Sequence, residues 1–387
     1  MSLCVMLTAA EASGDALGAG LMRALKARLG PQVRFVGLGG PAMAAEGLVS
    51  AFDIAELSVF GLVDGVMAAW RVSRRARELA ALAERERPDV AVLIDSWGFS
   101  HLLARALRRR LPDLPLVKYV APQVWATRPG RAKAVGKAFD WLLSIVAFEV
   151  PMFERAGAKV TFVGHPGASH DFSAADPARF RAAIGAGTGA PILLVLPGSR
   201  TSEIDRMLPP FGEAARLLKA ERPSLQVAVV AAPTVAGIVR ARVAGWPFRT
   251  CIVEGQAGKD DAMVAATVAL ACSGSVTTEL AAAGAPMVVG YKVGPVTHAI
   301  IKRIVRTRFA TLFNIAADEM IAPELLQYDC TGARLAQELA LRLDDAGLRA
   351  RQARAQSDAL SKLGRVDGPP ADRAAAAVLD VLKAKTV

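Results

Sequence analysis

The chain has 387 residues, enough for two domains of ordinary size, and although 53% of them are hydrophobic, no apolar run approaches the ~20 residues needed to span a membrane. The first residues, MSLCVMLTAAEASGD, lack the basic start of a secretory signal, so the sequence predicts a cytoplasmic location. A net charge of +11 favours anionic partners, but aromatic residues are only 6% and do not alternate with the basic clusters, which argues against nucleic acid and leaves phosphate or anionic lipid open.

Short apolar runs alternate with helical patterns along the chain, which is typical of parallel sheets covered by helices on both faces. In the first half we expect strands at 2–7, 33–37, 90–94, 116–119, 141–145 and 159–163. The helices between them are expected at 17–29, 67–85, 100–110, 131–139 and 150–156. In the second half strands are expected at 192–196, 226–231, 251–254, 268–271 and 287–290, and helices at 203–220, 235–243, 257–266, 277–283 and 294–305.

These elements predict an α/β protein with two Rossmann-like domains whose parallel sheets face one cleft. The expected first domain is 1–168, and a linker rich in Gly, Ala, Pro and Asp follows at 169–190. The second domain is expected at 191–345. Residues 346–387 have helical spacing, and the first domain is a candidate packing partner for them.

The segment LLVLPGSRTSE, residues 193–203, runs from an apolar strand into a turn that opens a helix. Gly198 permits close approach of the backbone to a ligand, and the helix start at Ser199 offers N–H groups. Arg200 adds a planar fork that suits phosphate oxygens. This pattern predicts an anion site.

A second turn of this kind follows the strand at 268–271. Gly274 and Ser275 open a helix, and Glu279 lies one turn further on, where it can reach a ribose diol. Backbone and helix dipole can hold a nucleoside diphosphate in this layout without a metal. Helix capping by the serines also explains the pattern and does not exclude binding.

The first half carries two polar loops after apolar strands. The loop 11–15 lacks the full G-x-G-x-x-G pattern, and we expect Glu11 and Ser13 to contact a sugar, with helix capping by Ser13 or Asp15 as the alternative. Asp95 ends the strand at 90–94, and the carboxyl ends of such strands are where open α/β sheets bind ligands. A carboxylate there can take a proton from an attacking hydroxyl, or it can cap the next helix.

Two basic clusters are further candidate binding sites. In YVAPQVWATRPGRAK, residues 119–133, the side chains of Trp125, Arg128 and Arg131 are compatible with a phosphate-bearing acceptor, although a solvated helix start is the commoner use of such a cluster. The segment 57–77 mixes apolar and basic residues and is a candidate surface for anionic lipid, whereas periodicity alone favours an amphipathic core helix. Its candidate contacts are Val59, Phe60, Leu62, Val63, Met67, Trp70, Arg71, Arg74 and Arg75.

The four cysteines are scattered, with no CxxC spacing and no histidine nearby, which argues against a zinc site or a disulfide framework. We therefore expect small buried thiols, no metal and no cofactor. They are Cys4, Cys251, Cys272 and Cys330.

Together these segments closely resemble the lipid-A-disaccharide synthase family of bacterial glycosyltransferases. The matching segments, in chain order, are AEASGD (10–15), GLGGPAMAAEGL (37–48), ELSVFGLVD (56–64), PDVAVLID (88–95), YVAPQVWATRPGR (119–131), FVGHP (162–166), LPGSRTSEI (196–204), SGSVTTELAAAGAPMVV (273–289) and FNIAADEMIAPELLQ (313–327).

The resemblance implies a GT-B fold whose C-terminal half binds UDP and whose N-terminal half receives the acceptor. It implies inverting transfer from UDP-2,3-diacylglucosamine to the 6-hydroxyl of 2,3-diacylglucosamine 1-phosphate, which forms a β-1,6 bond and releases UDP without a metal. Asp95, Glu11 and Arg200 match the family's functional residues, with Asp95 as general base. Asn314 and Glu324 lie in matching segments that shape the donor pocket.

Acylated substrates also imply peripheral binding to anionic lipid on the cytoplasmic face of the inner membrane. The chain departs from the family at Gly98, where many relatives have a second acidic residue, so a mechanism with two carboxylates is not expected. Other interpretations are a UDP-sugar 2-epimerase, another GT-B glycosyltransferase, or a non-catalytic protein that binds nucleotide or anionic lipid. The sequence leaves the oligomeric state open, a homodimer included.

Overall fold

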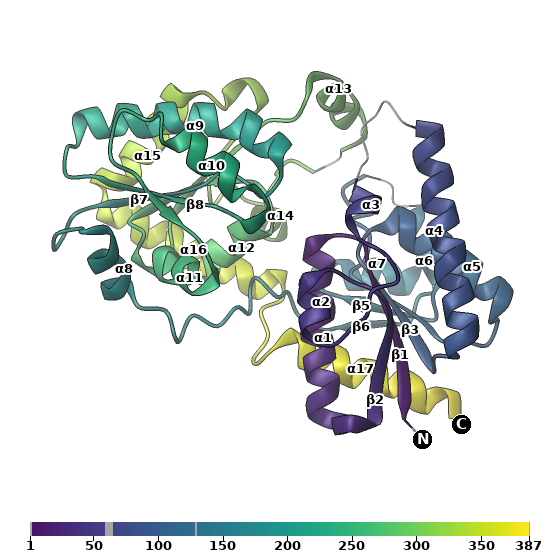
Figure 1. The fold of residues 1–387 in the computed structure, drawn as a ribbon. Helices are drawn as coiled ribbons and strands as arrows, with labels where there is room; N and C mark the ends of the chain where they lie inside the picture. Colours follow the sequence, from purple (N-terminus) through teal and green to yellow (C-terminus); the bar gives the residue numbers. More distant parts are fainter. Residues whose placement is uncertain (1, 59–64, 128–129, 306, 387) are drawn as a thin grey trace. The chain divides into compact units, whose positions relative to one another are not determined.

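The computed structural model describes residues 2–58, 65–127, 130–305 and 307–386 (Figure 1). The chain divides into two compact units, which we call unit 1 (Met1–Pro166 with Val366–Val387) and unit 2 (Gly167–Arg365). Each is built on a parallel sheet with helices between the strands, which confirms the expected α/β class.

Unit 1 has a parallel sheet with the order β2-β1-β3-β4-β5-β6 in the part of the chain that the structure describes. The central strands are buried because apolar side chains point to both faces, and all five residues of β3 are buried, whereas the edge strand β6 is partly exposed. The strands are β1 (Leu3–Ala9), β2 (Val33–Leu38), β3 (Val90–Ile94), β4 (Leu116–Tyr119), β5 (Trp141–Ser144) and β6 (Val160–Phe162).

Two apolar cores cover the faces of this sheet, one with α4 to α7 and the other with α1 and α17. The last helix, α17 (Pro370–Thr386), returns from the far end of the chain, and its Val378 shares a core with Leu21 of α1. The remaining helices of unit 1 are α1 (Ala12–Leu29), α2 (Pro41–Ala45), α3 (Ala55–Ser58), α4 (Gly65–Glu86), α5 (Trp97–Arg110), α6 (Arg131–Ala138) and α7 (Val150–Arg155), with 3-10 turns η1 (Gly30–Gln32) and η2 (Ala147–Glu149).

Unit 2 has a second parallel sheet, ordered β12-β11-β10-β7-β8-β9 across its described residues. The strands are β7 (Ile192–Leu196), β8 (Gln226–Val230), β9 (Cys251–Val253), β10 (Val268–Cys272), β11 (Met287–Tyr291) and β12 (Glu324–Leu326). The helices are α8 (Pro177–Ile184), α9 (Thr201–Glu221), α10 (Ala236–Val243), α11 (Gln256–Ala265), α12 (Ser275–Ala282), α13 (Pro295–Ile304), α14 (Leu312–Ala317), α15 (Gly332–Asp344) and α16 (Ala346–Leu363), with 3-10 turns η3 (Pro233–Val235) and η4 (Gln327–Asp329).

The segment expected as a linker, 169–190, lies within unit 2. Asp176 caps α8 by accepting a hydrogen bond from the Ala178 amide at 2.8 Å, and Arg179 of α8 binds the buried Asp261 of α11 at 2.6 Å. This segment therefore packs as part of the second unit.

The expected end of the second domain at residue 345 also differs from the structure, because α16 packs within unit 2. Its buried Gln352 and Gln356 donate hydrogen bonds to the carbonyls of Met287 and Ala285, at 2.7 and 2.9 Å. Of the two helices in the C-terminal segment, α17 is the one that belongs to unit 1.

Candidate active site

Several of the predicted site residues lie where the strand order of each sheet reverses. In unit 1, β1 lies between β2 and β3; Ser13 lies in the first turn of α1, which follows β1, and Asp95 directly follows β3. In unit 2, β7 lies between β8 and β10, and the turns that follow β7 and β10 carry Arg200 and Ser275. Open α/β sheets bind ligands at the carboxyl ends of strands at such reversal points.

The turn that carries Asp95 has an unusual backbone. Asp95 and Ser96 have φ angles of 50° and 38°, a left-handed conformation that costs of order 1–3 kcal/mol for a residue other than glycine. Neighbouring groups hold it: the Asp95 amide donates to the Tyr119 carbonyl at 2.9 Å, and Ser100 Oγ donates to the Asp95 carbonyl at 2.7 Å. Such strain is concentrated at functional sites.

The Asp95 side chain points toward the loop after β1. Its Oδ2 accepts a hydrogen bond from Ser13 Oγ at 3.3 Å, while the residue at the N-cap of α5 is Ser96. The structure thus brings Ser13 and Asp95 together, and the carboxylate remains partly exposed.

Asp15 has a structural role in the same first turn of α1. Its buried carboxylate accepts hydrogen bonds from the amides of Gly40, Ala42 and Met43 at 2.8 to 3.0 Å. Asp15 therefore anchors the GLGGPAM segment against α1 and does not cap α1 itself. Glu11 occupies the N-cap position of α1, and its carbonyl accepts from the Asp15 amide at 2.9 Å.

The turn after β7 is organised by Glu203. This carboxylate accepts hydrogen bonds from the amides of Ser199 and Arg200 at 2.9 and 3.2 Å, and it lies 3.3 Å from the Arg200 guanidinium. Gly198 has φ 116°, and a Cβ there would lie 2.6 Å from Glu203 Oε2. The glycine is thus needed for the close approach of Glu203, a contact that the sequence pattern did not reveal.

The Arg200 side chain, at the N-cap of α9, is 66% exposed and therefore accessible to a ligand. Two amides at this helix start already have an acidic partner in Glu203, so the guanidinium is the accessible cationic group of the turn. Any anion bound here would lie near Arg200.

The turn after β10 is more open than the turn after β7. Gly274 and Ser275 are exposed at the start of α12, and a Cβ on Gly274 would meet no described atom within 4 Å. One turn into α12, Glu279 forms an ion pair with Lys259 of α11. A ribose diol at Glu279 would therefore meet a paired carboxylate.

Asn314 and Glu324 hold the loop before β12 in a fixed shape. Glu324 accepts hydrogen bonds from the amides of Ala310 and Thr311, the Thr311 hydroxyl and Asn314 Nδ2, at 2.6 to 2.8 Å. Asn314 is fully buried and also bonds the backbone of 321–322. Ser273 Oγ reaches the Ala310 carbonyl at 3.4 Å, which links this cluster to the turn after β10.

Trp125 is anchored by a residue that sequence reasoning missed. Its indole N–H donates to Glu149 at 3.1 Å, and Ser144 Oγ lies 2.6 Å from the other oxygen of that carboxyl. Burial raises the pKa of Glu149 to about 7, against the opposing effect of these two hydrogen bonds. Arg131 is the first residue of α6, and Arg128 lies outside the described residues.

The candidate membrane surface is only partly described, because four of its residues lie outside the described residues: Val59, Phe60, Leu62 and Val63. Within α4, Trp70 is 60% exposed, and the Arg74 guanidinium lies 5.3 Å from its ring centroid. Arg75 instead forms ion pairs with Glu56 and Glu78. Met67 and Arg71 belong to the same helix.

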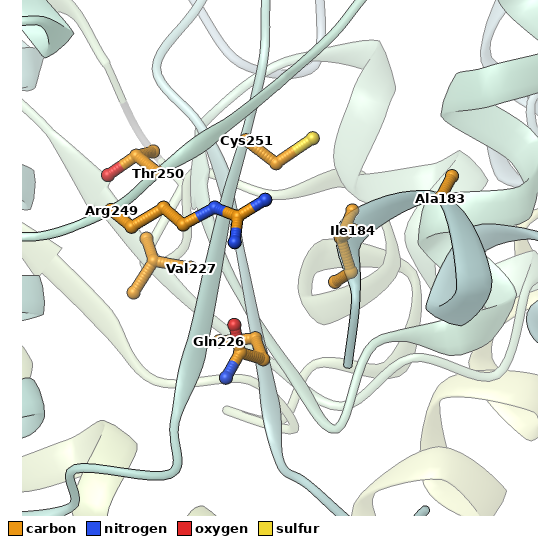
Figure 2. A pocket seen from close by; sticks show the side chains of 7 residues that line it. All are labelled: Ala183, Ile184, Gln226, Val227, Arg249, Thr250 and Cys251. Atoms are coloured by element: carbon orange, nitrogen blue, oxygen red, sulfur yellow. The ribbon is translucent and has the colours of Figure 1, made fainter. Parts of the chain in front are cut away.

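A hollow of about 120 Å³ lies elsewhere in unit 2 (Figure 2). It is lined by the last turn of α8 and by Gln226 and Cys251, the first residues of β8 and β9. These are the amino ends of the strands, opposite the edge that carries Arg200 and Ser275. In the described part of the chain, no His, Cys, Asp and Glu side chains form a group that could hold a metal ion.

The fold defines the class of protein, since two Rossmann-like units in one chain are the GT-B architecture. A putative UDP-N-acetylglucosamine 2-epimerase from Listeria monocytogenes superposes with a TM-score of 0.64 at 14% identity, covering 99% of this chain and 98% of that one. The rhamnosyltransferase SpnG, complexed with spinosyn aglycone, gives a TM-score of 0.57 at 16% identity, with coverage of 98% and 100%. These likenesses confirm the GT-B fold.

Sequence comparison identifies the family. The lipid-A-disaccharide synthetase family model matches residues 5–378. The lipid-A-disaccharide synthase of Rhodospirillum centenum is 42% identical over 385 residues, which covers 100% of this chain and 96% of the relative. The chain belongs to the lipid-A-disaccharide synthetase family and is a glycosyltransferase, as the sequence motifs predicted.

Proposed function

We propose that this enzyme transfers 2,3-diacylglucosamine from UDP-2,3-diacylglucosamine to the 6-hydroxyl of 2,3-diacylglucosamine 1-phosphate. The products are the β-1,6-linked disaccharide 1-phosphate and UDP. The observation that carries the proposal is the Asp95 carboxylate, held at the reversal point of unit 1 in a chain of this family.

Asp95 is proposed as the general base. The acceptor 6-hydroxyl gives its proton to the Asp95 carboxylate while its oxygen forms a bond to the donor anomeric carbon. The bond from that carbon to the diphosphate oxygen breaks, and the electron pair leaves with UDP. Attack opposite the leaving group inverts the configuration. Ser13, 3.3 Å from Asp95, fits a role in orienting the carboxylate or the acceptor, with Glu11 binding hydroxyls of the sugar.

In unit 2, Arg200 is proposed to offset the negative charge that develops on the departing diphosphate, because its guanidinium is exposed at the start of α9. The turn 198–200 and the turn at Gly274 and Ser275 follow neighbouring strands, so both fit the donor's diphosphate. Glu279 is proposed to bind the ribose. Asn314 and Glu324 are proposed to act by holding the shape of the donor pocket.

The acceptor side is proposed to involve Trp125, Arg128 and Arg131, the two arginines binding the 1-phosphate. We further propose that unit 1 binds an anionic membrane surface on the cytoplasmic face of the inner membrane, where acylated substrates reside. The exposed Trp70 beside Arg74 supports this proposal. No helix in the described ranges is both long and apolar enough to cross a membrane.

The test is a reaction with both substrates in detergent, followed by detection of UDP and of the disaccharide. The wild-type enzyme should form both products in equal amounts. Asp95→Asn should lower kcat by about 100-fold or more, because it removes the proton acceptor, while UDP affinity stays near the wild-type value. UDP release without disaccharide would refute the transferase assignment, and an active Asp95→Asn variant would exclude Asp95 as the base.

A further inference from the structure

Lys118 is a fully buried lysine that the proposed chemistry does not use. It lies in β4 between Val117 and Tyr119, with 0% of its surface exposed. Burial lowers its pKa to about 7, although the nearby Asp95 acts in the opposite direction. Lysine is among the residues least often buried in full unless its charge is paired, so this position calls for a physical reason.

The hydrogen bonds of Lys118 converge on one short segment. Its Nζ donates to the carbonyl of Asp95, to the Leu93 carbonyl at 3.3 Å and to Ser100 Oγ at 3.1 Å. An ammonium group has three N–H donors, and these three acceptors match them. All three belong to the end of β3 and the first turn of α5, which flank the strained residues Asp95 and Ser96.

The carbonyl of Asp95 receives two of the contacts in this cluster, one from Lys118 Nζ and one from Ser100 Oγ at 2.7 Å. Fixing this carbonyl fixes the peptide plane between residues 95 and 96. That plane sets the backbone angles of Asp95, and therefore the direction of its Cα–Cβ bond. Removing Lys118 would leave its acceptors without this donor, so its effect on stability and its effect on kcat have to be measured separately.

We propose that Lys118, together with Ser100, is a positioning residue that holds the Asp95 turn in its left-handed conformation and so aims the catalytic carboxylate. This inference rests on the proposed function, in which Asp95 is the base. Lys118 does not contact substrate in this proposal and acts only through the backbone of Asp95.

The experiment compares Lys118→Met, which keeps the length of the side chain and removes its donors, with Ser100→Ala. Each variant should lower kcat by about 10- to 100-fold, as expected for a base displaced by a fraction of an ångström to one ångström. The KM for both substrates should stay within about threefold of wild type, because binding groups are unchanged. UDP affinity should be unaltered, since Lys118 belongs to unit 1 and the proposed UDP site to unit 2.

The matched control is Val117→Ala, which alters an equally buried neighbour in β4 that makes none of these hydrogen bonds. It should lower the thermal midpoint and leave kcat within about twofold of wild type at temperatures well below unfolding. If Lys118 had only a structural role, Lys118→Met and Ser100→Ala would behave like Val117→Ala, with a lower thermal midpoint and a kcat near the wild-type value. A lower kcat at an unchanged KM would distinguish a role in positioning Asp95 from a role in packing alone.

Failure of the proposed function and failure of the positioning role give different results. A wild-type enzyme that forms no disaccharide refutes the proposed function itself. The positioning role is overturned if the wild type is active and the folded Lys118→Met variant keeps its kcat. It is also overturned if that variant loses activity only through a higher KM. If Lys118→Met does not fold, Ser100→Ala decides: a loss in kcat at constant KM supports the inference, and an unchanged kcat overturns it.

Discussion

The buried carboxyl of Glu149 leads to a quantitative prediction about pH. Burial raises its pKa from 4.5 to about 7. A tenfold change in an ionisation constant corresponds to about 1.4 kcal/mol, so ionisation of this group costs the folded state up to about 3 kcal/mol. The hydrogen bonds that Glu149 receives from Ser144 at 2.6 Å and Trp125 at 3.1 Å act in the opposite direction and do not outweigh burial.

Glu149 makes the folded state less stable as the pH rises, because its pKa is higher in the folded chain than in the unfolded chain. Below pH 4.5, Glu149 is protonated in both the folded and the unfolded chain, and its contribution to stability is fully present. As the pH rises, the unfolded chain ionises first, and the contribution is lost until the folded carboxyl also ionises at about pH 7. Above that pH, the loss stays constant.

Glu149→Gln removes the ionisable group while keeping a side chain of the same size whose amide oxygen can accept the Trp125 hydrogen bond. The thermal midpoint of the variant, relative to wild type, should therefore rise between pH 4.5 and about 8, by roughly 5 °C or more for a unit of this size. Glu154→Gln is the matched control, because Glu154 is exposed five residues further along the chain. A difference between Glu149→Gln and wild type that does not vary with pH, or the same trend in Glu154→Gln, would show that the reasoning is wrong.

Two further predictions concern charge. Arg200→Gln should lower kcat by about 10- to 100-fold without changing the thermal midpoint, because the guanidinium is exposed and its proposed role is to offset leaving-group charge; steady-state kinetics with an unchanged kcat would exclude that role. In sedimentation with vesicles that contain anionic lipid, the wild-type protein should bind at low salt and dissociate as salt rises, and an absence of binding at low salt would refute the membrane proposal.

The sequence was sufficient to predict the central strands. The runs at 90–94, 116–119 and 192–196 were predicted with their observed bounds, because a buried parallel strand is a continuous apolar run that ends at a turn. The strand β12 was missed because it is only three residues long and begins with Glu324. Its pairing with β11 is a long-range contact that no local pattern records.

The positions of Asp95 and Arg200 could be predicted, because each follows a strand whose apolar run is evident in the sequence. The candidate site was not predictable where a distant side chain supplies the support. The sequence pattern places Glu203 in a helix, as the structure does, but does not show that its carboxylate accepts hydrogen bonds from the turn that precedes that helix. Glu149 resembles an ordinary surface residue, because only the fold reveals that it is buried against Trp125.

The turn that carries the proposed base and the turn proposed for the diphosphate differ in backbone strain. In unit 1, β3 and β4 are followed by left-handed residues other than glycine: Asp95, Ser96 and Val120, the last with φ 69°. In unit 2, the turn after β7 places its left-handed angle on Gly198, where the conformation costs little. A base must be held at a fixed angle to one reacting atom, whereas a diphosphate can be held by several donors of a turn. The turn after β3 is therefore the one at which small displacements should affect kcat most, and Lys118 donates a hydrogen bond to the Asp95 carbonyl of that turn.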